Sequence, residues 1–223
     1  MRWVLMTVGL TATGYVVYVA QAWYRYGNAS APLTEESDAL LDEFMPEYEV
    51  AERHHVRVAA PANITLSAAM DTDLQKSKVI RGILQARVLI LGADADEGTR
   101  PRGLLAQTTS LGWGVLAEQP GREIVVGAVT QPWLANVVFR ALPREDFKAF
   151  REPGYVKIVW TLRADPVGPR ESIFRTETRV TTTDQTARSK FRWYWARFSP
   201  GIVLIRRAAL TLLKADAEGR AHQ

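Results

Sequence analysis

Two groups of side chains in this sequence have types that could do chemistry: a histidine pair and a glutamate between arginines. His54 and His55 are adjacent in a segment that alternates like a strand, so they point to opposite faces and cannot hold one metal ion together. The third histidine, His222, lies near the end of the chain. The sequence has no cysteine, which excludes disulfides, thiolate nucleophiles and cysteine-ligated zinc. We therefore expect no metal site and no cofactor.

Glu177 is the acid with the most distinctive surroundings. It lies between Arg175 and Arg179 at alternating positions, so the three side chains share one face of a strand. One interpretation is an ion-pair ladder on the surface. The other is a cavity carboxylate, anchored by Arg206 or Tyr194, that binds a ligand hydroxyl or acts as an acid or base. The sequence has no Gly-x-Ser-x-Gly motif to complete a catalytic set.

Large aromatic side chains and a row of threonines favour an apolar cavity over a closed core. Thr176 and Thr178 alternate with Phe174 and Val180, and a packed core rarely needs several hydroxyls on one strand face, although threonine is also a good strand former. Rings with a polar edge suit a mixed apolar ligand, but the same rings could simply fill the core. The candidate ligand-binding residues are Trp113, Trp133, Trp160, Phe174, Thr176, Glu177, Thr178, Tyr194 and Trp195.

The elements that must position these residues follow from the spacing of apolar side chains. Alternation predicts strands, and a Pro-Gly pair at Pro120 predicts a hairpin between two of them. Helical spacing predicts a short helix in the acidic region, one starting at Pro61 and a stronger one before the polar loop 93–103. The predicted strands cover 48–59, 113–118, 122–130, 155–164 and 172–182, and the predicted helices cover 35–44, 74–91 and 144–150.

The last part of the chain is predicted to be one long helix. Asp184 is a good N-cap residue, and beyond it apolar side chains recur every three or four residues from Phe191 to Leu212. Pro200 interrupts this stripe, so we expect a kink or a break next to it. Only this helix is large enough to cover the apolar face of an antiparallel sheet. We therefore expect an α+β fold in which a curved sheet wraps around the C-terminal helix and leaves a space between them.

Short motifs distributed over residues 48–218 support the same arrangement. They are Gly112-Trp113-Gly114-Val115-Leu116 with Glu118, Pro120 to Gly127, Pro132-Trp133, Phe147, Phe150, Pro153-Gly154-Tyr155, Thr176 to Val180, Phe191, Tyr194-Trp195 and Ile205-Arg206-Arg207. With the order of elements, they resemble a bacterial branch of the START-like superfamily, also called SRPBCC, polyketide cyclase-like or helix-grip. The resemblance implies a helix-grip fold. Because that fold hosts lipid carriers, hormone receptors, cyclases and chaperone-like modules, it does not specify a function.

The N-terminal residues 3–24 carry no charge. As a helix they would extend about 30 Å, the thickness of the hydrocarbon core of a bilayer, with Trp3 and Trp23 near the two interfaces. We expect a single-pass membrane anchor of uncertain orientation and therefore a membrane localisation. The alternative is a cleaved signal peptide, because Ala20-Gln21-Ala22 resembles a cleavage site.

Charge is unevenly distributed along the chain. Eight acids and no base lie within residues 26–52, six bases and no acid lie within residues 185–213, and the net charge is +4. The two regions could be solvated faces that attract each other, or the basic one could lie against anionic lipid headgroups. No helix-turn-helix, zinc or aromatic-basic RNA motif accompanies the basic residues, so we expect no nucleic-acid partner.

These observations predict an N-terminal anchor or signal peptide (1–25), an acidic linker (26–47), a START-like domain (48–218) and a short tail (219–223). The leading hypothesis is a membrane-tethered module that binds a hydrophobic small molecule or lipid between the sheet and the C-terminal helix. A second is an enzyme of the cyclase, dehydratase or hydrolase type that uses Glu177 and Tyr194 in that cavity. A third is a structural or assembly partner with a filled core. The oligomeric state does not follow from the sequence.

Overall fold

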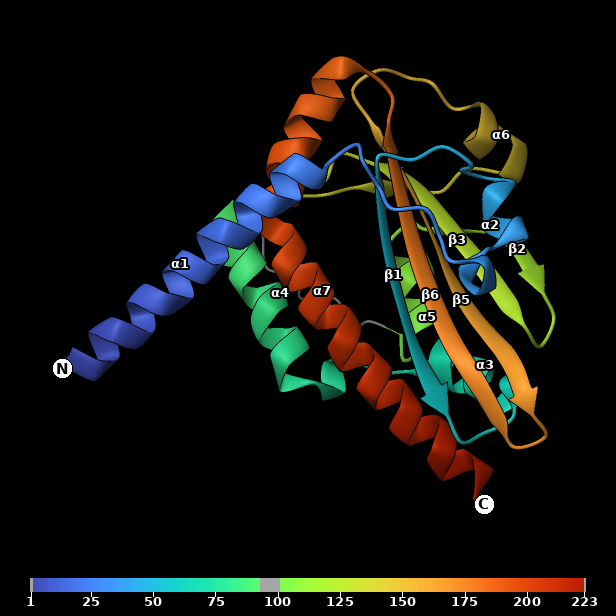
Figure 1. Cartoon of the computed structure of the whole chain (residues 1–223). Coiled ribbons are helices and arrows are strands. Elements are labelled where there is room, and N and C mark those ends of the chain that lie inside the picture. The colour runs from blue at the N-terminus through green and yellow to red at the C-terminus, as the bar shows by residue number, and fades with distance from the viewer. Residues whose placement is uncertain (1, 93–100, 223) are drawn as a thin grey trace.

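A computed structural model describes residues 2–92 and 101–222 of the chain. One antiparallel sheet forms its centre (Figure 1), with strand order β1-β6-β5-β3-β2 and β4 paired to β3. The predicted hairpin is confirmed, because β2 pairs with β3 across a turn in which the Arg122 amide donates to the Gln119 carbonyl. The strands are β1 (Val50–Val58), β2 (Gly114–Gln119), β3 (Glu123–Thr130), β4 (Phe139–Arg140), β5 (Val156–Gly168) and β6 (Glu171–Thr182).

The longest strand pair is β5 with β6. We expected a turn at residues 166–169, but β5 continues to Gly168 because Pro166 and Gly168 still pair with Ser172 and Glu171. A register shift between Pro166 and Gly168 accommodates the proline at the end of the strand. These two strands form the middle of the sheet and carry most of the residues that were predicted to bind a ligand.

The helix α7 (Gln185–Ala221) covers one face of the sheet. Its start is the predicted one, because the Asp184 carboxylate accepts hydrogen bonds from the Thr186 and Ala187 amides. The helix is not broken at Pro200, but Figure 1 shows that its first turns run at an angle to the remainder. The predicted kink is therefore present, as expected where a proline removes a backbone donor inside a helix.

Further helices surround this central pair of layers. The helix α3 packs on α7 and on β5, and α4 packs on α7. Two short elements, α5 and β4, were not predicted. The remaining helical elements are α1 (Arg2–Arg25), η1 (Thr34–Glu36), α2 (Ala39–Asp42), α3 (Ala62–Asp71), η2 (Leu74–Lys76), α4 (Lys78–Leu91), α5 (Leu104–Ser110) and α6 (Arg144–Ala149).

The other face of the sheet is covered by the acidic segment before β1. Leu41, Phe44 and Met45 are buried there against β3 and β5 side chains such as Val125 and Val159. Residues 26–47, which the sequence suggested as a linker, thus include part of a hydrophobic cluster. The sheet is covered on both faces, and the arrangement with the long C-terminal helix is the predicted helix-grip fold.

The prediction of a membrane-spanning anchor, and of a membrane localisation with it, is wrong. Among the helices of the described ranges, none is both long enough and apolar enough to cross a bilayer. Threonine, glycine and Gln21 lower the mean hydropathy of α1. The C-terminal half of α1 packs on α7 instead, where the Tyr15 hydroxyl donates to the Arg197 carbonyl (2.9 Å) and the rings of Trp23 and Trp193 lie 4.6 Å apart.

Candidate functional site

The core between the sheet and α7 consists of two apolar clusters. Near the start of α7, Phe191 and Trp195 pack with Val50, Val156 and Val180. Near its end, the second cluster contains Val58, Leu66, Ala164, Phe174, Leu213 and Ala217. A cavity of about 210 Å³ lies along α7 from Ile202 to Leu213, so this interface is not completely filled.

The cavity has an almost entirely apolar lining. The sheet forms one wall and α7 forms the opposite wall, while η2, α5 and the residue after α3 contribute the rest. Among the described residues of the lining, Thr72, Trp160, Thr176 and Arg206 have polar atoms in their side chains. The lining residues are Thr72, Leu74, Leu104, Trp160, Leu162, Phe174, Thr176, Ile202, Ile205, Arg206, Ala209, Leu210 and Leu213.

Strand alternation explains the wall that the sheet forms. Successive side chains of a strand point to opposite faces, so Trp160 and Leu162 of β5 point the same way, as do Phe174 and Thr176 of β6. All four line the cavity. Trp160 is opposite Thr178 in the β5–β6 register, so Thr178 belongs to the same face. Three of the predicted residues, Trp160, Phe174 and Thr176, therefore meet in one cavity wall.

Arg206 is the one charged residue among those that line the cavity. Its Nη1 donates to the Thr176 hydroxyl (3.4 Å) and its Nη2 donates to the Thr178 hydroxyl. Its Nε is buried and has no hydrogen-bond partner among the described residues. The two threonines thus hold the guanidinium at the cavity wall through uncharged groups.

Burial strongly affects the protonation of this guanidinium. Desolvation lowers the pKa of Arg206 from 12.5 to about 10, and the negative charge of Glu52 acts in the opposite direction. Arg206 therefore remains a cation at neutral pH. The Glu52 carboxylate lies 3.6 Å from His54 Nε2 on the same strand.

The remaining predicted aromatic residues lie outside this lining. Trp113 is not in the lining, but it packs on Trp160 in an edge-to-face arrangement with ring centroids 6.3 Å apart. Trp133, Tyr194 and Trp195 belong to the cluster near the start of α7. The aromatic stripe of the helix thus mainly builds core at that end, and the wall of the cavity comes from the smaller apolar side chains further along the helix.

Glu177 lies on the opposite face of β6 from the cavity. Its Oε1 contacts Arg53 Nη2 and Arg179 Nε, both at 2.8 Å. Its side chain is 7% exposed, so this is a buried ion-pair network and not the surface ladder that the sequence also allowed. Tyr194 stacks between Phe191 and Phe198 in α7. The structure therefore does not bring Glu177 and Tyr194 together.

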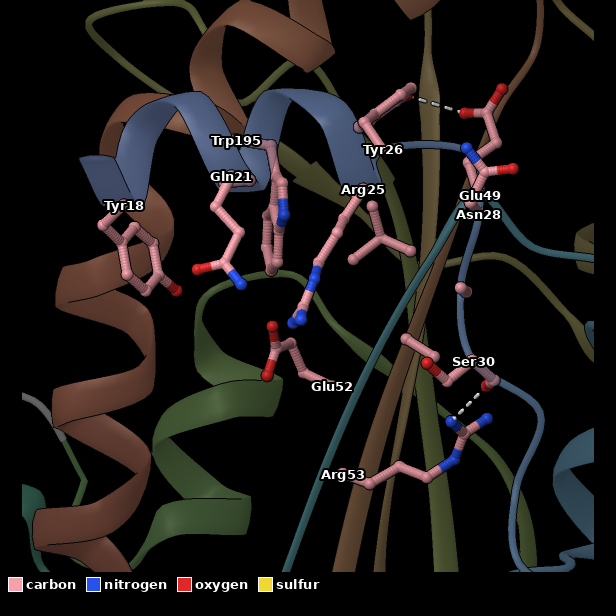
Figure 2. Close-up of a pocket in the computed structure, with 14 residues that line it drawn as sticks. Tyr18, Gln21, Arg25, Tyr26, Asn28, Ser30, Glu49, Glu52, Arg53 and Trp195 are labelled. Atoms are coloured by element: carbon pink, nitrogen blue, oxygen red, sulfur yellow. Dashed lines mark hydrogen bonds between the residues drawn. The ribbon is translucent and has the colours of Figure 1, made fainter. Parts of the chain in front are cut away.

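A second hollow lies between α1, β1 and the segment that joins them. Its volume is about 160 Å³, and Figure 2 shows that Gln21, Arg25, Glu52 and Trp195 converge on it. In its lining, the Tyr26 hydroxyl donates to Glu49 at 2.8 Å, and burial together with this contact raises the pKa of Tyr26 far above its usual value. The polar lining suits water or a polar group better than a hydrophobic molecule.

Sequence reasoning did not find the helix wall of the cavity as a site. Ile202, Ile205 and Ala209 belong to the apolar stripe that was predicted to face the sheet. Arg206 follows Ile202 by four residues and precedes Leu210 by four, so it lies within the apolar stripe of the helix. A basic residue in such a stripe was the sequence feature that could have indicated this site. Among the described residues, no three His, Asp or Glu side chains are grouped so as to hold a metal ion.

Among the comparisons with known proteins, only the comparison with solved structures found similar proteins. No family model and no curated protein matches the sequence. The hypothetical protein jhp0584 from Helicobacter pylori is 10% identical, with 84% of this chain and 99% of that chain covered and a TM-score of 0.41. Norcoclaurine synthase from Thalictrum flavum, in complex with dopamine and hydroxybenzaldehyde, is 12% identical, with coverage of 82% and 96% and a TM-score of 0.35.

A START superfamily protein from Mycobacterium smegmatis is also similar. It is 12% identical, with 78% of this chain and 97% of that chain covered and a TM-score of 0.27. Its description names the superfamily that the sequence motifs resemble. Because one fold hosts many functions, what this chain binds depends on the cavity and its side chains.

Proposed function

We propose that this protein binds a small hydrophobic molecule in the cavity between β5, β6 and α7. The observation that carries the proposal is an unfilled space of about 210 Å³ with a largely apolar lining, inside an interface that is otherwise packed. The space is partly open to solvent, and an apolar lining with few polar groups is typical of small-molecule sites.

The size of the cavity limits the ligand. An apolar cavity of about 150 Å³ stays dry and binds benzene, so the space here suits a single ring with a short chain or an alkyl chain of similar volume. Cavities that enclose drug-sized ligands begin at about 300 Å³. The proposed ligand class is therefore smaller than a sterol or a two-chain lipid.

A neutral probe tests the proposal without reference to any polar group. Propylbenzene should bind the full chain, as detected by ligand-observed NMR, and should raise the melting temperature. At a free concentration of 100 Kd the stabilisation is about 2.7 kcal/mol. For a chain of this size that corresponds to a rise of roughly 5–10 °C.

Two variants of α7, each with one alanine replaced by tryptophan, locate the binding site. Ala209 lines the cavity, so A209W should fill it and abolish propylbenzene binding while the far-UV circular dichroism spectrum stays helical. Ala215 is exposed on the same helix, so A215W is the matched control and should bind as the unmodified chain does. The proposal fails if the unmodified chain does not bind propylbenzene, or if A209W binds it as well as A215W does.

A further inference from the structure

The cavity wall contains a half-buried arginine, Arg206, whose desolvated guanidinium has surroundings that differ from those of the buried arginines. Arg179 is 1% exposed and has two carboxylate partners, Glu177 at 2.8 Å and Asp42 at 2.5 Å. Arg163 likewise contacts Asp38 and Asp165. Arg206 has no carboxylate within ion-pair distance in the part of the chain that the structure describes, although its guanidinium is desolvated.

The hydrogen bonds of Arg206 are also incomplete. A guanidinium has five N–H donors, and the described residues accept two of them, through the hydroxyls of Thr176 and Thr178. The buried Nε has no acceptor in the described part of the chain. A buried donor that lacks a partner is costly, and more so when it is charged. The guanidinium therefore has unused donors beside a space with an apolar lining.

A second unpaired polar atom lies on the same side of the sheet. His54 is opposite Thr176 in the β1–β6 register, so the two side chains share a face. The Nε2 atom of His54 is buried and has no hydrogen-bond partner within residues 2–92 and 101–222. Glu52, opposite Thr178, lies 3.6 Å from this nitrogen. Polar groups are thus concentrated around Arg206, while the remainder of the cavity is apolar.

We infer that the ligand is a small amphipathic carboxylate whose acidic group pairs with Arg206 while its apolar body fills the cavity. This inference rests on the proposed function, because it assigns the ligand class of the same cavity. A planar guanidinium presents paired donors that match the two oxygens of a carboxylate. The apolar walls formed by Leu162, Phe174 and Leu213 would contact only the hydrocarbon part.

The charge balance favours a carboxylate over a phosphate ester. Arg206 supplies one positive charge, and the nearest acid that affects it, Glu52, is negative. A monoanion matches the single charge of the guanidinium, whereas a phosphate ester brings a second negative charge that has no partner in the lining and increases the repulsion by Glu52. The inferred head group therefore carries a single charge.

The test compares two probes of one carbon skeleton on the full chain, 4-propylbenzoate and 4-propylbenzyl alcohol, with propylbenzene as the reference. The unmodified chain should bind the carboxylate more tightly than the alcohol, by on the order of 10- to 100-fold, as expected for a buried charge-assisted pair. Arg206→Met should remove this preference and keep propylbenzene binding. Arg207 is the exposed neighbour, so Arg207→Met is the matched control and should keep the preference.

The outcomes separate this inference from the proposed function. If propylbenzene binds but the carboxylate and the alcohol bind equally well to the unmodified chain, the inference is overturned and the proposed function stands. That comparison needs no variant, so it remains decisive if Arg206→Met does not fold. If Arg207→Met loses the preference as fully as Arg206→Met does, surface charge is responsible and the inference fails. If no probe binds, the proposed function itself fails.

Discussion

The buried network around Glu177 leads to a quantitative prediction. Replacement of Glu177 by glutamine keeps the size of the side chain and removes its negative charge, which contacts Arg53 and Arg179 at 2.8 Å each. Loss of one partner of a buried ion pair typically costs about 3–5 kcal/mol, because an unpaired charge remains. Here the cost is reduced, because Arg179 keeps Asp42 and the Met45 carbonyl as acceptors.

We therefore expect E177Q to lower the free energy of unfolding by about 2–3 kcal/mol. For a chain of this size the melting temperature should fall by roughly 4–12 °C. Urea unfolding followed by circular dichroism measures the change, with the m-value as a check on two-state behaviour. Glu118 is exposed on β2, so E118Q is the matched control and should change stability by no more than about 0.5 kcal/mol.

Ligand binding decides between the structural and the cavity interpretation of Glu177. Because the residue lies on the opposite face of β6 from Thr176, E177Q should bind propylbenzene with unchanged affinity under conditions where it is folded. Unchanged stability would refute the role of the network in the fold. Unchanged stability together with lost binding would mean that Glu177 acts at the cavity after all.

Two further predictions concern the fold. Gly112 has φ +97°, and a Cβ there would overlap the Phe139 carbonyl oxygen. At Gly121 φ is also positive but the space is open, so G121A should cost about 1–2 kcal/mol and G112A should cost more. Equal losses of stability in urea unfolding would contradict the overlap. Burial and a hydrogen bond with Asp38 hold the pKa of Glu123 well above its usual value of 4.5. The folded state then retains a proton that the unfolded state loses, so this contribution to stability is complete below about pH 4.5 and declines as the pH rises. E123Q should flatten the fall in stability between pH 5 and 8, and an unchanged slope would exclude Glu123 as its source.

Much of the framework could be predicted from local patterns. Alternation in β6 assigns Thr176 and Thr178 to one face and Glu177 and Arg179 to the other, because the side-chain period of a strand is two residues. The Asp184 cap and the hairpin at Gly121 are also local, since each depends on a few consecutive residues. These predictions succeeded because the backbone geometry that decides them lies within one element or one turn.

Other features depended on contacts between distant parts of the chain. Arg206 meets Thr176 and Thr178 from 30 and 28 residues away, and the sequence alone did not indicate which face of β6 it would contact. Leu41 and Phe44 cover the opposite face, which makes Glu177 part of a buried network although its pattern is equally typical of a surface strand. Half of α1 packs on α7, although its lack of charge suggested a lipid environment.

The sequence by itself therefore determined five of the six strands, the long helix and the two faces of each central strand. Only the tertiary structure decided which face encloses the cavity, and that Arg206 is the cation at its wall. The physical reason is that periodicity records which side chains share a face, whereas the burial of that face and its neighbours depend on how separate elements pack.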